Sequence, residues 1–158
     1  MKFDLLNTED GRLPYLQHFC EKLLAAENWQ PVVLTREWAK SISLAAGVYV
    51  IRHDNEIVYV GESGSLSGRM LDLLNTKNHT VRRSLGKKYF STHIEYKKAS
   101  STVGYALSIE LLLNEFINKN LTVAFLEMSL GRKELEDFIV SSIDKGLRLN
   151  IRVGRKAK

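Results

Sequence analysis

The sequence predicts an α+β fold, in which helices flank a small, mostly antiparallel β-sheet. Two observations predict it. Residues 47–52 and 57–61 are rich in β-branched and aromatic side chains and flank His53-Asp54-Asn55, which is the pattern of a β-hairpin. On both sides of this hairpin, apolar residues recur at helical spacing. A hairpin combined with separate helices is typical of an α+β domain.

The first part of the chain, residues 1–45, predicts an N-terminal helical extension. Pro14 begins a predicted helix over 14–26, in which apolar side chains recur at helical spacing. Thr35 can cap a second, short helix. We therefore divide the chain into this extension and a second domain, residues 46–158, which ends in a basic tail.

The second domain continues beyond the hairpin with further helices and strands. Ser65 or Ser67 can cap a helix that runs through Arg69 to about Asn75. Helices are also predicted over residues 79–85, 105–118 and 132–145, and strands over residues 92–97 and 121–127. Gly146 is suited to end the last helix.

Basic residues are concentrated in the second domain. The net charge is +5; residues 1–45 hold five Lys or Arg and six Asp or Glu, whereas residues 46–158 hold eighteen and twelve. Because each neutralised phosphate releases counterions, this distribution suits a polyphosphate partner, and a solvated surface or a basic tail would give the same charge. The residues predicted to bind nucleic acid are Arg82, Arg83, Lys87, Lys88, Arg152 and Arg155.

Several other classes of protein are excluded. The single cysteine, Cys20, excludes an intramolecular disulfide and predicts a reduced, cytoplasmic protein. No apolar run approaches the ~20 residues that span a bilayer, so no membrane partner is expected. One cysteine and four scattered histidines give no structural zinc spacing. The glycines at 61, 64 and 68 are not followed by the Gly-Lys-Ser/Thr of a phosphate-binding loop.

Two tripeptides, ten residues apart, are the most informative motif. Gly47-Val48-Tyr49 precedes Tyr59-Val60-Gly61, and Arg69 follows the second tripeptide by eight residues on a predicted helix. Later in the chain, Glu136 lies on a predicted helix that precedes Asn150. In this order, these residues resemble the GIY-YIG nuclease superfamily over roughly residues 46–151, with Val in place of Ile in each tripeptide.

The resemblance implies a GIY-YIG-type endonuclease that hydrolyses DNA phosphodiester bonds with a divalent metal, Mg²⁺ or Mn²⁺. The partner is expected to be DNA, in duplex, structured or single-stranded form. Cleavage of both strands would require two subunits or two binding events, so a homodimer is one expected arrangement. The implied catalytic residues are Tyr49, Tyr59, Arg69, His79, Glu136 and Asn150, with Glu136 as the metal ligand.

These residue types suit phosphodiester hydrolysis, which needs an activated water and charge stabilisation on the phosphoryl oxygens. Glu136 can hold one hard cation that keeps most of its waters, and Arg69 offers a planar fork matched to phosphate. Tyr49 could orient or deprotonate the water, because a phenol near a cation ionises more easily. Tyr59 could bind the phosphate or share that task, and His79, which titrates near neutrality, could move a proton or bind a phosphate.

The hairpin must bring both tyrosines to one face of the sheet. A two- or four-residue turn would pair Tyr59 with Val50 and place Tyr49 on the other face. A three-residue loop, His53-Asp54-Asn55, pairs Tyr49 with Tyr59, and Asn55 tolerates the left-handed conformation of such a loop. We therefore predict the three-residue loop.

Glu136 is preferred as the catalytic carboxylate because of its helical surroundings. At ~100° per residue, Ile139 and Ile143 lie on the same helix face, where a carboxylate is costly unless something compensates it. Glu134 points the opposite way, toward solvent. Glu110 is a rival, since apolar residues flank it too, but no asparagine follows it in the family's order.

Two positions depart from the family's pattern. Leu73 stands where many members carry a histidine or tyrosine, and Glu62 stands where many repair-type members carry a lysine. Both changes remove a proton carrier or a phosphate contact. They favour one alternative, a catalytically silent nucleic-acid-binding module with the same fold. A second alternative is a protein-interaction adaptor that uses the N-terminal helices and binds DNA only weakly at low salt.

Overall fold

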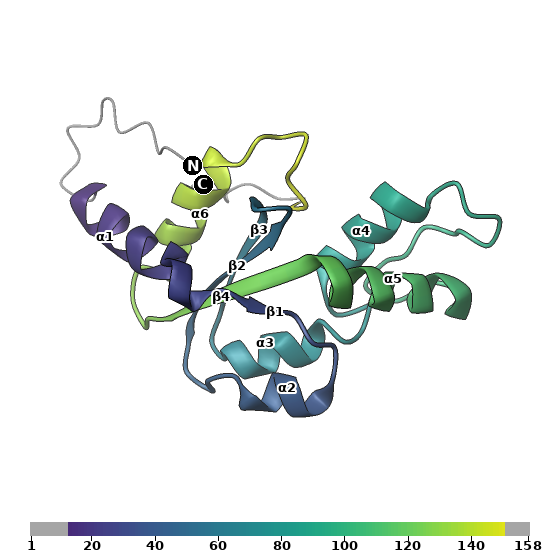
Figure 1. The fold of residues 1–158 in the computed structure, drawn as a ribbon, viewed down its shortest axis with the longest axis horizontal. Helices are drawn as coiled ribbons and strands as arrows, with labels where there is room; N and C mark the ends of the chain where they lie inside the picture. The colour runs from purple at the N-terminus through teal and green to yellow at the C-terminus, as the bar shows by residue number, and fades with distance from the viewer. Residues whose placement is uncertain (1–12, 151–158) are drawn as a thin grey trace.

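A computed structural model, which describes residues 13–150, has the α+β architecture that the sequence predicts (Figure 1). Its helices and strands lie in an order that matches most of the predicted segments. They are α1 (Leu13–Leu24), the 3₁₀ helix η1 (Ala26–Asn28), β1 (Gln30–Pro31), α2 (Arg36–Ser41), β2 (Gly47–His53), β3 (Glu56–Ser63), α3 (Leu66–Asp72), α4 (Thr80–Phe90), α5 (Leu107–Asn120), β4 (Leu121–Glu127) and α6 (Arg132–Ser142).

The four strands form one antiparallel sheet in the order β1-β4-β2-β3, with a hydrophobic core on each face. Side chains alternate between the faces along a strand. Val48 and Val50 of β2 pack with α1 and α6. Tyr49 and Ile51 pack with α3, α4 and α5. In Figure 1 these two groups of helices lie on opposite sides of the sheet.

The turn of the β2–β3 hairpin differs from the prediction. Asp54 and Asn55 form a two-residue turn with φ angles of 50° and 63°, and His53 pairs with Glu56. Two successive left-handed residues are the backbone of the tight turn that suits the twist of two strands. The predicted three-residue loop is therefore wrong.

A β-bulge nevertheless places the two tyrosines on the same face, as predicted. The register between β2 and β3 shifts between Ile51 and Arg52, which leaves Val58 as an extra residue, and Tyr59 then pairs with Ile51. A shift of one residue moves every following side chain to the other face. Tyr59 consequently shares its face with Ile51 and Tyr49.

The predicted helix caps are confirmed, and one predicted strand is wrong. The Thr35 hydroxyl accepts a hydrogen bond from the Trp38 amide, and the Ser65 hydroxyl accepts one from the Gly68 amide, each at 3.1 Å. Residues 92–97 form turns and a loop instead of a strand. Ile94 is 96% exposed there, so this segment has no apolar face to bury against a sheet.

The N-terminal segment contributes to both cores. Leu23 of α1 lies in the core under α6, and Val32 and Ala39 lie in the core on the other face. The unpredicted strand β1 pairs Gln30 with Val123 of β4. The division of the chain at residue 45 stays a prediction.

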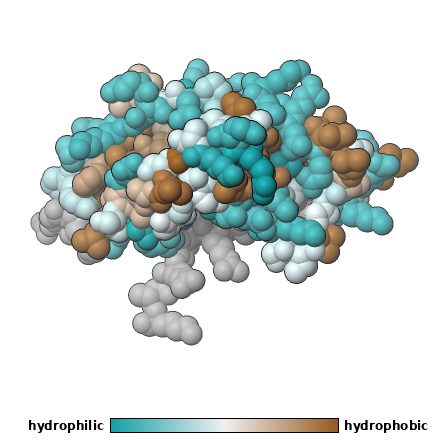
Figure 2. All heavy atoms as spheres, turned by 90° about the horizontal axis from the view of Figure 1, so that it is seen from below, coloured by the Kyte–Doolittle hydropathy of each residue, from teal (hydrophilic) through white to brown (hydrophobic). Residues whose placement is uncertain are grey.

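The face seen in Figure 2 is mostly hydrophilic, with apolar side chains gathered toward one end. Exposed apolar residues on α5 and on the loop before it are Ile94, Val103, Leu107 and Leu111. Within residues 13–150, no helix combines the length and the hydrophobicity needed to cross a membrane.

Candidate active site

The hydroxyl of Tyr49 is the centre of a polar cluster on the α3–α4 side of the sheet. It lies 3.0 Å from His79 Nε2 and accepts a hydrogen bond from Arg69 Nε at 3.3 Å. The rings of Tyr49 and Tyr59 have their centroids 5.9 Å apart. Strands β2 and β3, helix α3 and the start of α4 thus bring four of the predicted site residues together.

The second glycine of the motif makes room for this cluster. Gly61 lies directly opposite Tyr49 across the hairpin. A Cβ atom at Gly61 would lie 2.4 Å from the Tyr49 hydroxyl oxygen, closer than any real contact. The Tyr49 ring therefore lies flat against the backbone of β3, which only a glycine at position 61 permits.

His79 is held as a neutral imidazole with a defined tautomer. It is the N-cap of α4, and its Nδ1 accepts a hydrogen bond from the Val81 amide at 3.2 Å. The ring proton therefore lies on Nε2 and is donated to the Tyr49 oxygen. Burial lowers the pKa of His79 well below its usual value, and the neighbouring Arg69, Arg83 and Arg82 guanidinium groups lower it further. The expectation that His79 titrates near neutrality is wrong.

Tyr49 is likewise a poor acid in this environment. Burial and the neighbouring Tyr59 raise its pKa well above the usual value, and the opposing effect of Arg69 is smaller. The expected acidification by a nearby cation is therefore present but outweighed by desolvation. Because Tyr49 is fully buried and Tyr59 is 7% exposed, Tyr59 is the tyrosine closer to solvent.

Arg69 combines internal contacts with an accessible edge. Its Nη1 donates to Asp72 Oδ2 at 3.1 Å and to the Asn78 carbonyl at 2.9 Å. The side chain remains 24% exposed, and none of the residues from 13 to 150 bonds to its Nη2. A guanidinium fixed at two nitrogens can present the third to a phosphate oxygen without further ordering.

Glu136 lies in a second cluster, on the α6 side of the sheet. Its side chain is 16% exposed and lies 3.5 Å from Lys133 Nζ. Burial raises the pKa of Glu136, Lys133 opposes this, and the nearby Glu62 carboxylate adds to it. Glu62, at the end of β3, pairs with Arg132 at 3.0 Å. The structure thus adds Glu62 to the candidate residues, next to the glycine of the second tripeptide.

The two clusters meet at β3, which is an edge strand of the sheet. Glu62 directly follows Gly61, against which the Tyr49 ring lies. No hydrogen bond or ion pair within residues 13–150 joins Glu136 to Arg69. Arg69 on α3 and Glu136 on α6 therefore lie on opposite sides of the sheet, and both helices pack next to β3.

The donors present suit a hard cation rather than a transition-metal cage. Within the described part of the chain, no three His, Cys, Asp or Glu side chains cluster in a way that could hold a metal. Mg²⁺ commonly keeps several waters and needs one or two carboxylates. Glu136 offers that chemistry, and the Glu62 carboxylate is near enough to raise the pKa of Glu136.

Asn150 ties the C-terminal segment to the outer edge of β3. Its side-chain amide donates to the Val60 carbonyl at 2.8 Å and accepts from the Val60 amide at 3.2 Å. The Leu149 amide donates to the Val58 carbonyl at 2.7 Å. These bonds satisfy backbone groups that an edge strand leaves open. Asn150 therefore holds in place the strand that carries Tyr59.

Arg82 does not face a nucleic acid, which corrects one predicted contact. Its side chain is 1% exposed and pairs with Glu110 at 2.5 Å. It also donates to Asn114 Oδ1 at 2.7 Å and to Thr76 Oγ1 at 3.0 Å. A charge buried and paired in this way holds α4 to α5. Glu110, the rival for the catalytic carboxylate, is the partner in this ion pair.

The other residues predicted to bind nucleic acid differ in whether their charged groups are bound within the protein or exposed to a ligand. Arg83 donates to the Thr76 and Lys77 carbonyls and so fixes the turn before α4. Lys87 and Lys88 are exposed on α4. Arg152 and Arg155 lie outside the described residues.

Comparison with known proteins adds one finding. A family model described as the GIY-YIG catalytic domain matches residues 35–156, which include each residue of the two clusters. A search of curated proteins and a search of solved structures each returned no match.

Proposed function

Because the chain belongs to the GIY-YIG nuclease superfamily, we propose that it is a divalent-metal-dependent endonuclease that hydrolyses DNA phosphodiester bonds. The observation that supports this most is the cluster around Tyr49, which fixes Arg69 and Tyr59 beside each other at the edge of the sheet. Arg69 would bind the scissile phosphate through its accessible edge. Tyr59 would orient the attacking water.

The hydrogen bonds in the cluster have a direction. His79 Nε2 and Arg69 Nε both donate to the Tyr49 oxygen, which leaves the Tyr49 hydroxyl proton free to point toward Tyr59, whose ring lies next to that of Tyr49. In this arrangement the Tyr59 oxygen would accept a hydrogen bond from the Tyr49 hydroxyl and keep a lone pair for water. In this proposal Tyr49 and His79 are positioning residues, and Tyr59 meets the reacting water.

Glu136 would hold the metal, with Glu62 as the second carboxylate beside it. A bound Mg²⁺ or Mn²⁺ would acidify a coordinated water and neutralise charge on the phosphoryl oxygens. Glu136 must be ionised to bind a cation. Because burial raises its pKa, we expect metal affinity to weaken as the pH falls toward that pKa.

A nicking assay on supercoiled plasmid with Mg²⁺ or Mn²⁺ tests the proposal. The wild-type chain should nick the plasmid. Arg69→Ala and Glu136→Ala should each lose about 10²- to 10³-fold in rate, as removal of one transition-state contact does. Lys119→Ala, in an exposed ion pair on α5, is a matched control that should cut normally.

A catalytically silent nucleic-acid-binding module is the second candidate. Two observations favour it: Leu73 is fully buried and supplies no proton carrier, and no direct bond joins Glu136 to Arg69. Wild-type protein that binds plasmid with saturation but never nicks it, with either metal, would establish this candidate and end the proposal of an endonuclease.

We also propose that two copies cooperate when both strands are cut. The exposed Leu107 and Leu111 on α5 are the apolar residues that a dimer could bury. Light scattering across a range of protein concentrations tests this, and Leu111→Glu should shift the mass toward the monomer. The proposal of a reducing, cytoplasmic location rests on the single cysteine of the sequence, Cys20, which is buried.

A further inference from the structure

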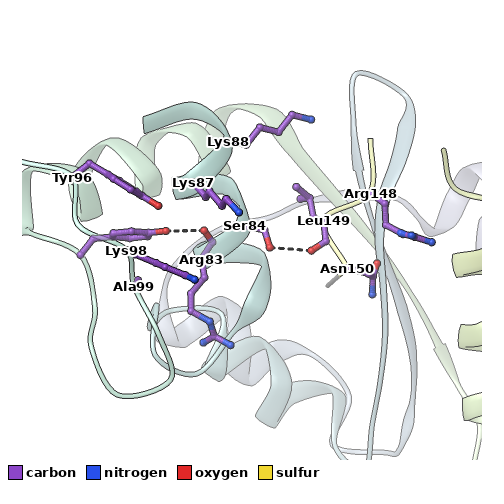
Figure 3. Close-up of a pocket in the computed structure, with 11 residues that line it drawn as sticks. Arg83, Ser84, Lys87, Lys88, Tyr96, Lys98, Ala99, Arg148, Leu149 and Asn150 are labelled. Carbon is purple, nitrogen blue, oxygen red and sulfur yellow. Dashed lines mark hydrogen bonds between the residues drawn. The ribbon is translucent and has the colours of Figure 1, made fainter. Parts of the chain in front are cut away.

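A basic cleft lies beside the candidate site, between α4, the loop that precedes α5, and the segment Leu149-Asn150 (Figure 3). Its volume of about 520 Å³ falls within the ~300–1,000 Å³ typical of small-ligand sites. It is lined by Arg83, Ser84, Lys87, Lys88, Tyr96, Lys98, Ala99, Tyr105, Arg148, Leu149 and Asn150. No acidic side chain is among these lining residues.

One wall of the cleft is an aromatic pair, of which Tyr105 is held against α4. The Tyr105 hydroxyl donates to the Arg83 carbonyl at 2.7 Å. Its ring lies so close to α4 that a Cβ atom at Gly86 would come within 2.4 Å of it. The half-buried ring of Tyr96 lies next to it, with centroids 5.6 Å apart and planes at 35°. A preorganised aromatic surface is thus present before any ligand arrives.

Three cations that line the cleft have no acidic partner among residues 13–150. Within residues 13–150, Lys87, Lys98 and Arg148 take part in no ion pair with an acidic side chain. Figure 3 shows Lys88 and Arg148 pointing away from the cleft, whereas Lys87 lies between the aromatic wall and Leu149. The described part of the protein therefore leaves these charges available to a polyphosphate ligand.

We propose that this cleft binds an unpaired nucleotide in a single-stranded stretch of the substrate, a role that rests on the proposed nuclease function. The base would stack on Tyr96, and the phosphates on either side would bind Lys87 and Lys98. Aromatic stacking combined with a basic groove is how proteins bind single strands without reading sequence. A base inside an intact duplex has no face free to enter such a cleft.

The position of the cleft connects it to the reaction. Asn150 lines the cleft and also bonds to both backbone groups of Val60, the neighbour of Tyr59. The cleft therefore adjoins the strand that carries Tyr59. A strand that crosses Tyr59 can place its next unpaired nucleotide in the cleft, which favours substrates with a flap, gap or bubble beside the scissile bond.

Fluorescence anisotropy in EDTA tests the proposal, because chelation stops cleavage. The probes are a short labelled oligothymidylate and a blunt duplex of the same length. Tyr96→Ala should weaken oligothymidylate binding by about 5- to 100-fold, as loss of one stacked base does, and should leave the duplex within about twofold. Lys87→Ala should reduce the salt dependence of oligothymidylate binding by a slope of ~0.7.

Three controls make the result specific. Tyr96→Phe keeps the ring and should bind like wild type. Lys40→Ala removes the same charge from the exposed surface of α2 and should leave the salt slope unchanged. Lys98→Ala, at an exposed position, should repeat the effect of Lys87→Ala if either variant is compromised in folding.

Three results would overturn the proposal. The first is that Tyr96→Ala weakens the binding of oligothymidylate and of the duplex equally. The second is that Tyr96→Ala weakens the binding of neither probe. The third is thymidine monophosphate binding as tightly as the oligonucleotide, which would assign the cleft to a free nucleotide. The binding assay needs no cleavage, and Glu136→Ala should keep the Tyr96 effect. If the protein cleaves no DNA but Tyr96→Ala still weakens oligothymidylate binding, only the proposed nuclease function is refuted. If the protein cleaves DNA but Tyr96→Ala does not weaken that binding, only the proposed nucleotide site is refuted.

Discussion

Arg69 and Arg82 lie on neighbouring helices, yet the protein surrounds them in opposite ways. Arg82 is buried, and Glu110, Asn114 and Thr76 bind its nitrogens. Arg69 is 24% exposed: its Nε donates to a neutral tyrosine hydroxyl, its Nη1 pairs with Asp72 at the surface, and its Nη2 bonds to none of residues 13–150. The first arginine therefore serves the fold, whereas the second keeps charge available for a phosphate. The difference predicts that changes around Arg82 act on stability and changes around Arg69 act on chemistry.

The largest expected effect comes from breaking the buried ion pair. Arg82→Ala leaves the Glu110 carboxylate without its partner, and breaking such a pair costs about 3–5 kcal/mol of unfolding free energy. Urea denaturation measures this loss. Lys119→Ala breaks the exposed pair with Glu115 and should cost at most about 1 kcal/mol. Equal losses in both variants would contradict the structural role of Arg82.

The next effect concerns the space that Tyr49 occupies. In Gly61→Ala, the added methyl group overlaps the Tyr49 ring, and overpacking of this kind costs about 1–3 kcal/mol. Urea denaturation and the nicking assay should both register the change, because the displaced phenol no longer aligns Arg69. Gly64→Ala is the matched control, since a Cβ atom there meets nothing within 4 Å. A stable and fully active Gly61→Ala variant would refute the close packing.

The smallest effect is a pH dependence that originates at His79. Its pKa is lowered in the folded protein, so the unfolded chain binds the proton first and stability is lost as the pH falls through the unfolded value near 6.5. Between pH 7.0 and 5.5 the expected loss is about 1 kcal/mol. His79→Asn, which can still cap α4, should show a flatter profile in urea denaturation. An equally steep profile in that variant would assign the pH dependence to other groups.

The sequence predicts the fold well where the signal is local. The hairpin, the caps at Thr35 and Ser65, and the helix that carries Glu136 all follow from neighbouring residues. The register of the hairpin does not follow from neighbouring residues, because the bulge at Val58 depends on how β3 packs against the rest of the sheet. The two-residue turn and the bulge together place Tyr59 on the same face as Tyr49, as the predicted loop would have done. The spacing of the residues alone does not reveal this combination.

The site is less predictable from sequence, because its charges depend on distant partners. Arg82 and Arg83 are adjacent basic residues, and only the position of Glu110, on another helix, shows that Arg82 is neutralised. In the sequence, Glu62 only replaces the lysine that many repair-type members carry, whereas in the structure its carboxylate is near enough to raise the pKa of Glu136. Burial is equally hidden, and it determines that Tyr49 and His79 remain neutral.

A crystal structure of the protein with uncleaved DNA and Mn²⁺ would test most directly whether the two clusters at β3 act on one phosphate. Anomalous scattering locates the ion. The account predicts Mn²⁺ bound to Glu136, with a phosphate that contacts both the ion and the Arg69 guanidinium. An ion bound elsewhere, or a phosphate that reaches Arg69 while Glu136 remains paired with Lys133 and metal-free, would contradict it.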